Sequence, residues 1–482
     1  MANPPPPHLL ARFKDLLGPK GFTTDPAEMA PWLEDWRKRF RGAAAAMVSP
    51  ASTAEVAEIV RACAEERVPL VPQGGNTSMV GGAVPTPAGD ALLLSLRRMN
   101  RIRALSAEAG TGVAEAGVVL AHFHEAAAAV GRRFPLTLGA RGSATIGGLV
   151  STNAGGTQVL RFGTMRGLVQ GIEAVLPDGS VFDGLAPLKK DNRGYDLRQL
   201  LIGAEGTLGV VTAASLKLVP AVGARSVAWI GLATPEKALG LLRLLDDEVG
   251  DAVESFELVP NAALDLVLRH VPGTRPPLEG AHPWHVLVEA VAPPGAPSPE
   301  AILGRALGAA LETGVVDDAV IGASEAQAAA FWRLRDSISE AEKADGPAAK
   351  HDVSVEVAAM PRFMVETAAA VEARFPGVRV IAFGHLGDGN VHFNARAPIG
   401  AAPAWVEGEG QAVTAFVHDL VVAAGGSISA EHGIGQMRLS ELARLGDPAR
   451  LGAMRAIKQA LDPHGIMNPG KLVPLAEAPH RP

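Results

Sequence analysis

The chain contains little cysteine and few aromatic residues, and each shortage excludes a class of protein. Its 482 residues include one cysteine, Cys63, so an intrachain disulfide is excluded and a reducing compartment is indicated. Cys63 lies on an apolar helical pattern, which favours a small core residue over a reactive thiol. Because no CxxC pair exists, an iron–sulfur centre is not expected. One tyrosine and 4% aromatic residues leave few stacking platforms for single-stranded nucleic acid.

Long apolar runs and an excess of positive charge are also missing. No stretch of eighteen apolar residues occurs, and the N-terminal MANPPPPHLL lacks the basic and apolar regions of a signal peptide. We therefore expect a cytoplasmic protein without a transmembrane segment. The formal net charge of −7 gives no attraction for nucleic acid or anionic lipid. The length and the 48% apolar content predict a globular protein of two or three domains.

Neither common nucleotide-binding fingerprint is present, yet glycine is concentrated in one place. No GxGxxG with a following acid and no GxxxxGK[ST] occur. Six of the twenty residues from Thr137 to Gly156 (TLGARGSATIGGLVSTNAGG) are glycine, against 54 in the whole chain. Glycine lets a ligand lie against bare N–H groups, and the interspersed Ser, Thr and Asn add donors. This composition predicts a cradle for a phosphate-bearing cofactor.

Two further glycine-rich stretches share this chemistry. Gln73–Gly82 (QGGNTSMVGG) follows the apolar run VPLVP, and Ile202–Thr212 (IGAEGTLGVVT) ends in a run typical of a strand. Ser52 and Glu55 form a predicted capping box for a helix that ends near Arg67. That helix would complete a βαβ unit, which places the Gln73 loop at the carboxyl end of a strand. Any one cluster is equally consistent with bulges and turns of an ordinary sheet, but three favour a cofactor site.

The other segments of the first half predict structure without chemistry. His8–Gly42 is predicted to form two short surface helices, and His122 and His124 lie on an alanine-rich helix, where a surface or structural role is favoured. Asp178 and Gly179 form a hairpin signal.

From Ser226 onward, strands and helices alternate. Thr234-Pro235 and Ser298-Pro299 each open a helix that follows a strand, which predicts a plait of antiparallel strands with helices on one face. Ser324 and Gln327 predict the start of one long helix that reaches about Ala344.

The segment GHLGDGNVHFN carries the first candidate metal ligands. With Asp388-Gly389 as a two-residue turn, His385 is expected opposite His392, and Phe383 opposite Asn394. Such a pair of imidazoles can reach one metal ion. The alternative is a polar hairpin with two solvated histidines.

The segment SAEHGIG supplies a third candidate ligand. It contains Glu431, with His432 next to it. Two histidines and one carboxylate suit zinc or manganese acting as a Lewis acid.

Several motifs together resemble one known family. PQGGNTSMVGG, GSATIGGLVSTNAGG, GYDLRQLLIGAEGTLGVVT and MNPGK are similar, in this order, to the FAD motifs of flavoproteins of the vanillyl-alcohol oxidase type. Within that superfamily the chain resembles the D-2-hydroxy acid dehydrogenases, over about residues 48–473. The resemblance implies an α+β fold in which a two-subdomain FAD-binding fold carries an inserted α/β, ferredoxin-like plait as a cap domain. The predicted parts are N-terminal helices at 1–45, an FAD-binding domain at 46–222, a substrate-binding cap domain at 223–425 and a segment at 426–482 that returns to the FAD domain.

The resemblance also implies a set of FAD-binding residues. The pyrophosphate is expected on the Gln73–Gly82 loop and the isoalloxazine ring near Gly147 and Gly155. Asn76 stands where some relatives carry a flavin-linking histidine, so the attachment is expected to be non-covalent. The implied cofactor-binding residues are Pro72, Gly74, Gly75, Asn76, Thr77, Ser78, Gly81, Gly82, Gly139, Gly142, Ser143, Thr145, Ile146, Gly147, Gly148, Asn153, Gly155, Gly156, Glu205, Gly209, Val210, Val211 and Asn468.

The family's catalytic motifs are intact as well. GHxGDGNxH and EHG are its metal ligands and catalytic histidine, which implies metal ligation by His385, His392 and Glu431 and catalysis by His432. LRDSIS…KHDVS resembles the segment that binds the substrate carboxylate, which makes Arg335, Ser339 and Lys350 candidates, with Asn394 beside the metal. By spacing alone, Arg335 would be a solvated charge, and Lys350 would pair with a neighbouring acid.

These residues predict the oxidation of R–CHOH–COO⁻ to a 2-oxo acid. The flavin would take the hydride, a divalent metal, zinc first, would lower the pKa of the hydroxyl, and His432 would accept its proton. Two cations in the clamp favour a dicarboxylate, D-2-hydroxyglutarate before D-malate. An external acceptor, an electron-transfer flavoprotein or a quinone, would reoxidise the flavin, and a homodimer is possible.

Three alternatives stay open from the sequence. One is a D-lactate or glycolate dehydrogenase or oxidase of the same superfamily. The others are a flavin-free, metal-dependent hydrolase and a cofactor-binding protein without turnover.

Overall fold

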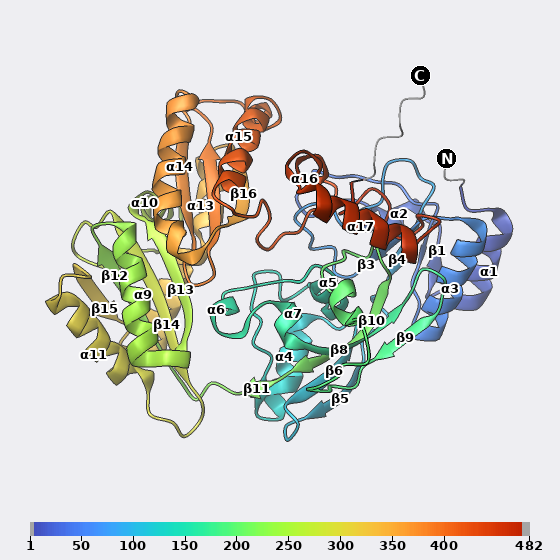
Figure 1. Cartoon of the computed structure of the whole chain (residues 1–482), viewed down its shortest axis with the longest axis horizontal. Coiled ribbons are helices and arrows are strands. Elements are labelled where there is room, and N and C mark those ends of the chain that lie inside the picture. The colour runs from blue at the N-terminus through green and yellow to red at the C-terminus, as the bar shows by residue number, and fades with distance from the viewer. Residues whose placement is uncertain (1–3, 475–482) are drawn as a thin grey trace. The chain divides into compact units, whose positions relative to one another are not determined.

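The chain folds into two compact units in a computed structural model that describes residues 4–474 (Figure 1). Unit 1 comprises the described part of 1–156, 163–219 and 431–482, and unit 2 comprises 157–162 and 220–430. The sequence predicts the corresponding boundaries at 222/223 and 425/426. The first three residues and residues 475–482, which it assigned to the N-terminal helices and the C-terminal segment, lie outside the described residues.

The first sheet of unit 1 is built around a parallel core. Its four strands have the order β1-β2-β4-β3. Strands β2 and β3 each pair in parallel with β4, so the predicted parallel start of the chain is confirmed, with β4 inserted between them. The strands are β1 (Phe22–Thr23), β2 (Ala46–Val48), β3 (Leu70–Gln73) and β4 (Leu92–Ser95).

Helix α3 (Thr53–Glu66) connects β2 to β3 and packs into the core. The Ser52 hydroxyl accepts a hydrogen bond from the Glu55 N–H, and the Glu55 carboxylate accepts one from the Ala51 N–H, which confirms the capping box. Cys63 lies on the buried side of this helix, and burial raises the pKa of its thiol. Cys63 is therefore a core residue, as predicted.

The second sheet of unit 1 is antiparallel, with the order β5-β6-β10-β8-β9. The predicted Asp178-Gly179 turn joins β8 to β9, with Gly179 at a φ of +81°. His122 is exposed on helix α4 (Leu120–Ala129), and His124 contacts the Leu136 carbonyl, which agrees with the predicted surface or structural roles. These strands are β5 (Ile102–Ser106), β6 (Thr111–Glu115), β8 (Val169–Val175), β9 (Val181–Gly184) and β10 (Val210–Lys217).

The remaining elements of unit 1 are short helices and strand pieces around these two sheets. They are α1 (Pro7–Leu17), α2 (Pro26–Met29), η1 (Ala30–Trp32), α4 (Leu120–Ala129), β7 (Arg132–Arg133), α5 (Ile146–Ser151), α7 (Met165–Leu168), α8 (Leu197–Leu201), α16 (Leu439–Leu445) and α17 (Pro448–Leu461), with β11 (Val219–Pro220) at the boundary to unit 2. No helix of the described part of the chain is long and apolar enough to span a bilayer.

The C-terminal segment belongs to unit 1 and bonds to its earliest loops. Met467 forms a parallel bridge with Leu70 of β3. The Gln436 amide donates to the carbonyls of Gly81 and Val84, and the Asn468 amide donates to that of Gly82. Residues from the C-terminal end of the chain therefore complete the first sheet and its loops. Gly82 and Asn468, for example, are 386 positions apart in the sequence.

Unit 2 is an antiparallel sheet of seven strands in the order β15-β12-β14-β13-β17-β18-β16, which confirms the predicted plait (Figure 1). Its strands are β12 (Ala224–Leu232), β13 (Val253–Pro260), β14 (Trp284–Ala292), β15 (Asp318–Ile321), β16 (Ala348–Ser354), β17 (Arg379–His385) and β18 (Asn390–Arg396). Its helices are α6 (Val159–Phe162), α9 (Pro235–Val249), η2 (Gly250–Ala252), α10 (Asn261–His270), α11 (Pro299–Glu312), α12 (Glu325–Asp336), α13 (Ile338–Asp345), η3 (Val357–Ala359), α14 (Met360–Arg374), η4 (Pro403–Glu407) and α15 (Glu409–Ala423).

Helices cover both faces of this sheet, so the prediction of helices on one face was wrong. Lys350 of β16 contacts Glu342 on α13, whereas the next residue, His351, contacts Thr414 on α15. Because successive residues of a strand point to opposite faces, α13 and α15 lie on opposite sides. The apolar core on the α13 side also joins Trp229 and Phe383 to helices α10 and α12.

The predicted long helix from Ser324 is two helices. Its start is confirmed, because the Gln327 N–H donates to the Ser324 hydroxyl. It ends at Asp336, and α13 begins after Ser337. Arg335 and Ser339 therefore lie on different helices.

The β17–β18 hairpin has a different register from the predicted one. His385 pairs with Asn390, and His392 pairs with Phe383, because the loop between the strands is two residues longer than a two-residue turn. A shift of two positions preserves the face of every side chain, whereas a shift of one would invert it. His385 and His392 thus remain on one face as diagonal neighbours, with ring centroids 5.4 Å apart.

Residues 157–162 contact unit 2 although the sequence assigned them to the FAD-binding domain. The Ser255 hydroxyl donates to the Thr157 carbonyl at 2.9 Å. Gln158 and Arg161 both donate to the carboxylate of Glu254, at 3.2 and 3.1 Å. No periodic pattern marks these side-chain contacts, so they could not be predicted from the sequence.

Candidate active site

The two glycine-rich stretches at the start of unit 1 meet at close range. A Cβ on Gly74 would lie 2.2 Å from the Thr145 hydroxyl oxygen, and one on Gly75 would lie 1.8 Å from the Ser143 carbonyl oxygen. Only glycine permits this approach, so the predicted halves of the cradle form one structure.

A cavity of about 650 Å³ opens where they meet. It is lined by Trp36, Gly74, Gly75, Asn76, Thr77, Ser78, Met79, Ala83, Leu138, Gly139, Ala140, Ser143, Ala144, Thr145, Gly148, Leu149, Thr152, Ala154, Gly155, Glu431 and His432.

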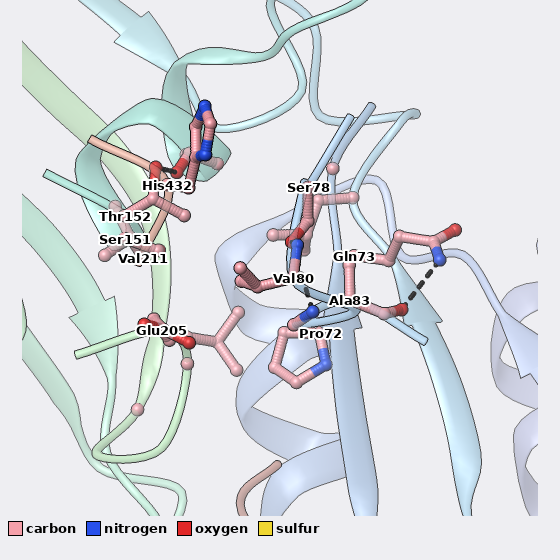
Figure 2. Close-up of a pocket in the computed structure, with 18 residues that line it drawn as sticks. Pro72, Gln73, Ser78, Val80, Ala83, Ser151, Thr152, Glu205, Val211 and His432 are labelled. Atoms are coloured by element: carbon pink, nitrogen blue, oxygen red, sulfur yellow. Dashed lines mark hydrogen bonds between the residues drawn. The ribbon is translucent and has the colours of Figure 1, made fainter. Parts of the chain in front are cut away.

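A smaller cavity of about 70 Å³ adjoins the large one and shares His432, Ser78 and Thr152 with it. Figure 2 shows His432, Thr152 and Glu205 on one side of this space and Ser78, Val80 and Pro72 on the other. His432 therefore lines the space that the glycine-rich loops enclose.

Glu205 fixes the segment that carries His432. Its two carboxylate oxygens accept hydrogen bonds from the N–H groups of Ile434 and Gly435, both at 2.8 Å. Burial raises the pKa of this carboxyl, although the two N–H groups and Arg438 act in the opposite direction. The carboxylate also lies beside Gly82, so it links the C-terminal segment to the wall of the smaller cavity.

Most of the predicted cofactor-binding residues line one of the two cavities. The predicted residues that do not are Gly81, Gly142, Ile146, Asn153, Gly156 and Asn468. Two of these have a supporting role instead: Asn468 donates to the Gly82 and Glu205 carbonyls, and Asn153 accepts from Thr164 and Arg166.

The sequence analysis missed several lining residues, of which Trp36 is the largest. It falls in the N-terminal segment that was read as free of chemistry. The other lining residues that were missed are Gln73, Met79, Val80, Ala83, Leu96, Leu138, Ala140, Ala144, Leu149, Ser151, Thr152, Ala154 and Gly206. They are mostly apolar or small. All of these except Leu96 lie in or next to the glycine-rich stretches already singled out, so extending each stretch to its neighbours would have found them.

The cradle fits a large phosphate-bearing cofactor on its own geometry. Glycine N–H groups and the hydroxyls of Ser78, Ser143 and Thr145 line the larger cavity. The Thr145 hydroxyl is buried without a hydrogen-bond partner among the described residues, as expected of a group that a ligand completes.

Unit 2 carries the second group of candidate residues, on the α13 side of its sheet. Glu257 of β13 is buried there between Arg335 and His385. Arg335 Nε donates to Glu257 Oε2 at 2.8 Å, and His385 Nδ1 lies 2.7 Å from Glu257 Oε1. Burial alone would raise the pKa of Glu257, but Arg335 and His385 outweigh it and hold the pKa far below its ordinary value.

The same face holds the other predicted histidine. His392 Nδ1 lies 4.0 Å from the carboxylate of buried Asp352. Arg335 Nη2 lies 3.2 Å from His385 Nε2, the nitrogen that does not face Glu257. Metal ligation by that nitrogen would require the guanidinium to move away from it.

Lys350 and Asn394, a directly opposed pair of β16 and β18, share one buried acid. Glu342 Oε2 accepts hydrogen bonds from Lys350 Nζ at 3.2 Å and from Asn394 Nδ2 at 2.7 Å. Lys350 therefore has the neighbouring acid that the alternative interpretation required. Ser339 reaches Lys350 through its backbone carbonyl, at 3.5 Å, rather than through its hydroxyl.

The structure thus gathers Arg335, Lys350, His385, His392 and Asn394 on one face of unit 2. The two imidazoles are a donor set that suits zinc or a similar divalent ion, and Asp352 is a nearby carboxylate. Glu431 and His432 lie in unit 1, so their assignment beside these residues rests on the sequence motif.

Comparison with known proteins defines the class to which this fold and these residues belong. The C-terminal domain of FAD linked oxidases matches residues 223–472, and the FAD binding domain matches residues 44–184. The chain belongs to the FAD-linked oxidases and is an FAD-dependent oxidoreductase.

Within this class the chain is of the D-2-hydroxyglutarate dehydrogenase-like type. It is 38% identical, over 94% of its length and 81% of the relative's, to the mitochondrial D-2-hydroxyglutarate dehydrogenase of Bos taurus. It is also 38% identical to the D-2-hydroxyglutarate dehydrogenase of Xanthomonas citri pv. viticola, over 95% of both chains.

Solved structures show the same fold at much lower sequence identity. p-Cresol methylhydroxylase superimposes with a TM-score of 0.74 at 15% identity and covers 96% of both chains. The 4-ethylphenol oxidase of Gulosibacter chungangensis gives 0.69 at 18% identity and covers 98% of this chain and 97% of its own. The predicted α+β, FAD-binding fold is confirmed.

Proposed function

We propose that the protein oxidises D-2-hydroxyglutarate, and D-malate less efficiently, to the corresponding 2-oxo acid. The observation that carries this proposal is the grouping of Arg335 and Lys350 with His385, His392 and Asn394 on one face of unit 2. Two cations match the two carboxylates of a dicarboxylate substrate. The relatives are named D-2-hydroxyglutarate dehydrogenase, and 2-hydroxyglutarate is a dicarboxylate.

Each candidate residue has a role that its chemistry supports. Arg335 binds the α-carboxylate, since a planar guanidinium can form two parallel hydrogen bonds with it. Lys350 binds the distal carboxylate, with Asn394 as a donor beside it, and Ser339 flanks the lysine. His432 accepts the proton of the C2 hydroxyl, because an imidazole can be deprotonated near neutral pH.

Bound FAD would supply the acceptor for the hydride. The glycine-rich loops around Gly74, Gly75 and Gly148 would hold it non-covalently, with the Thr145 hydroxyl as an available donor. His385, His392 and Glu431 would hold a divalent metal, with zinc as the first candidate, and the metal would supply Lewis acidity toward the substrate oxygens.

A monocarboxylate such as D-lactate is the second candidate. The Lys350–Glu342 pair favours it, because a lysine already neutralised by a buried acid attracts a second carboxylate less. Membership of the FAD-linked oxidases removes the flavin-free hydrolase from consideration.

The flavin spectrum tests the proposal directly. Under anaerobic conditions, D-2-hydroxyglutarate should bleach the visible absorption of the purified protein, and the L enantiomer should not. Absence of bleaching with D-2-hydroxyglutarate, D-malate and D-lactate alike would contradict it.

The electron acceptor, assembly and location complete the proposal. We propose an electron-transfer flavoprotein or a quinone as acceptor, a homodimer and a cytoplasmic location, and no nucleic-acid partner. Reoxidation assays with each acceptor, light scattering and fractionation of cells test these points.

A further inference from the structure

Three ion pairs lie along the face of unit 2 that carries the candidate substrate residues. Arg335 pairs with Glu257 at 2.8 Å, Lys350 pairs with Glu342 at 3.2 Å, and Arg396 pairs with Asp345. Each cation is therefore matched by one acid. A ligand that brings a further negative charge to Lys350 meets a site whose positive charge is already balanced.

Glu342 is the acid whose surroundings least favour a permanent negative charge. Its side chain is 0% exposed, whereas Lys350 is 26% exposed and accessible to a ligand. Oε2 accepts from Lys350 and Asn394, but Oε1 is buried without a hydrogen-bond partner among the described residues. Burial raises the pKa of Glu342 even though Lys350, Asn394 and Arg396 favour its charged form.

The cations of the neighbouring helices face other acids. From α10, Arg269 and His270 face Asp345, and from α12, Arg335 faces Glu257. The charged groups that act most strongly on Glu342 are Lys350 and Arg396, and Arg396 is itself paired with Asp345.

A carboxylate that binds Lys350 would place two carboxylates against one ammonium. Two like charges that share a site strongly disfavour double ionisation, so one of them takes a proton. We propose that Glu342 takes up one proton from water when a dicarboxylate binds at Lys350, and that this coupling sets the selectivity between dicarboxylates and monocarboxylates. The product of the uptake is a neutral carboxyl whose Lys350 partner is released to the ligand. This inference rests on the proposed function, because it assigns the distal carboxylate to Lys350.

Calorimetry on the oxidised holoenzyme measures the proton directly. 2-Oxoglutarate, the expected product, is titrated in two buffers of different ionisation enthalpy at one pH, and pyruvate is the monocarboxylate control. We expect uptake that approaches one proton per 2-oxoglutarate and a clearly smaller uptake with pyruvate. Glu342→Gln keeps the shape of the side chain and should abolish the difference in proton uptake between 2-oxoglutarate and pyruvate. Glu340→Gln, at an exposed position on the same helix, should retain that difference.

The pH dependence of binding gives a second readout that needs no variant. The dissociation constant of 2-oxoglutarate should rise with pH by up to about tenfold per pH unit more than that of pyruvate, because one extra proton is bound. This comparison keeps the inference testable if Glu342→Gln does not fold.

The outcomes separate the inference from the proposed function. Equal proton uptake with both ligands, or unchanged uptake in Glu342→Gln, would overturn the inference while D-2-hydroxyglutarate still bleaches the flavin. Failure of every D-2-hydroxy acid to bleach the flavin would instead overturn the proposed function.

Discussion

The Nδ1 atom of His385 lies 2.7 Å from a carboxylate oxygen of Glu257, and both side chains are almost fully buried. This contact favours the tautomer with the proton on Nδ1 and leaves Nε2 as the acceptor, with Arg335 Nη2 lying 3.2 Å from it. The same carboxylate accepts from Arg335, so one acid orients a candidate metal ligand and a candidate substrate ligand.

Replacing Glu257 should therefore weaken metal binding without removing a ligand. We expect Glu257→Gln to lower the affinity for zinc about 10–100-fold, as measured by competition with a chromogenic chelator. Loss of one partner of a buried pair should also lower the free energy of unfolding at pH 7 by about 3–5 kcal/mol. Since the pKa of Glu257 is lowered on folding, its stabilisation is present above the unfolded pKa of 4.5 and lost as the pH falls through the folded value. The stability difference between variant and wild type should accordingly narrow in acid.

The exposed Glu279 provides the matched control, and Glu279→Gln should change neither quantity. Unchanged zinc affinity in Glu257→Gln would show that His385 does not need this acid.

Removal of a proposed ligand should have a larger effect on the metal. His392→Ala is expected to lose bound metal and turnover but to keep its flavin, since the glycine-rich loops lie in unit 1. Elemental analysis and the visible spectrum of the same sample measure both. His122→Ala, on the surface of α4, is the control, and full activity of His392→Ala after chelation would refute the metal assignment.

The flavin should be released without breaking a bond. The Asn76 amide donates to the Glu34 carbonyl, and an amide cannot form the covalent link that a histidine forms in some relatives. Acid precipitation should leave all the yellow colour in the supernatant. Yellow protein in the pellet would contradict this expectation.

Glu205 should control how tightly the flavin is held. In Glu205→Gln an amide N–H₂ would face one of the two backbone N–H groups of Ile434 and Gly435, and one donor would be left without a partner. The cost of about 1–2 kcal/mol corresponds to a five- to thirtyfold weaker FAD affinity. Flavin fluorescence on dilution measures the release, with Glu108→Gln, an exposed position, as control. Equal retention in both variants would show that this acid does not support the pocket.

Lys350 should bind the distal carboxylate of the substrate. A charge-assisted contact contributes about 1.5–3 kcal/mol, so kcat/KM for D-2-hydroxyglutarate should exceed that for D-lactate by at least about tenfold. Lys350→Ala should remove this preference and leave D-lactate nearly unchanged. If D-lactate is the better substrate and the variant lowers all rates equally, the substrate is a monocarboxylate.

The sequence identified the elements of the site because its signals are local. Glycine at Gly74 and Gly75, the Ser52–Glu55 box and the period-2 pattern around His385 each depend on neighbouring residues. The sequence predicted the face of the two histidines correctly and their register wrongly. A turn that is two residues longer costs little free energy, whereas a register shift of one residue would turn the buried side chains of the strand toward solvent.

Long-range contacts between side chains left no such signal. Glu257 looks like an ordinary charged residue in the sequence, yet it is buried against Arg335, 78 positions away. Glu342, by contrast, lies only 8 positions from Lys350 and is the kind of neighbouring acid that the sequence left open as an alternative. The break at Ser337 was also missed, because the residues around it are compatible with a continuous helix. The sequence thus predicted most helices and strands, but it did not predict which side chains of distant elements pair with one another.

The return of the C-terminal segment to unit 1 has a consequence for biosynthesis. Unit 2 is encoded between the two halves of the flavin pocket, and its last helix, α15, ends at Ala423. On the ribosome, a nascent chain can therefore fold the whole sheet of unit 2 before Gln436 and Asn468 are synthesised. Until then, the carbonyls of Gly81 and Gly82 lack the hydrogen bonds that these two side chains donate. We expect flavin capture to be one of the last events in the maturation of the chain, and a truncation after residue 430 to yield a folded plait that stays colourless.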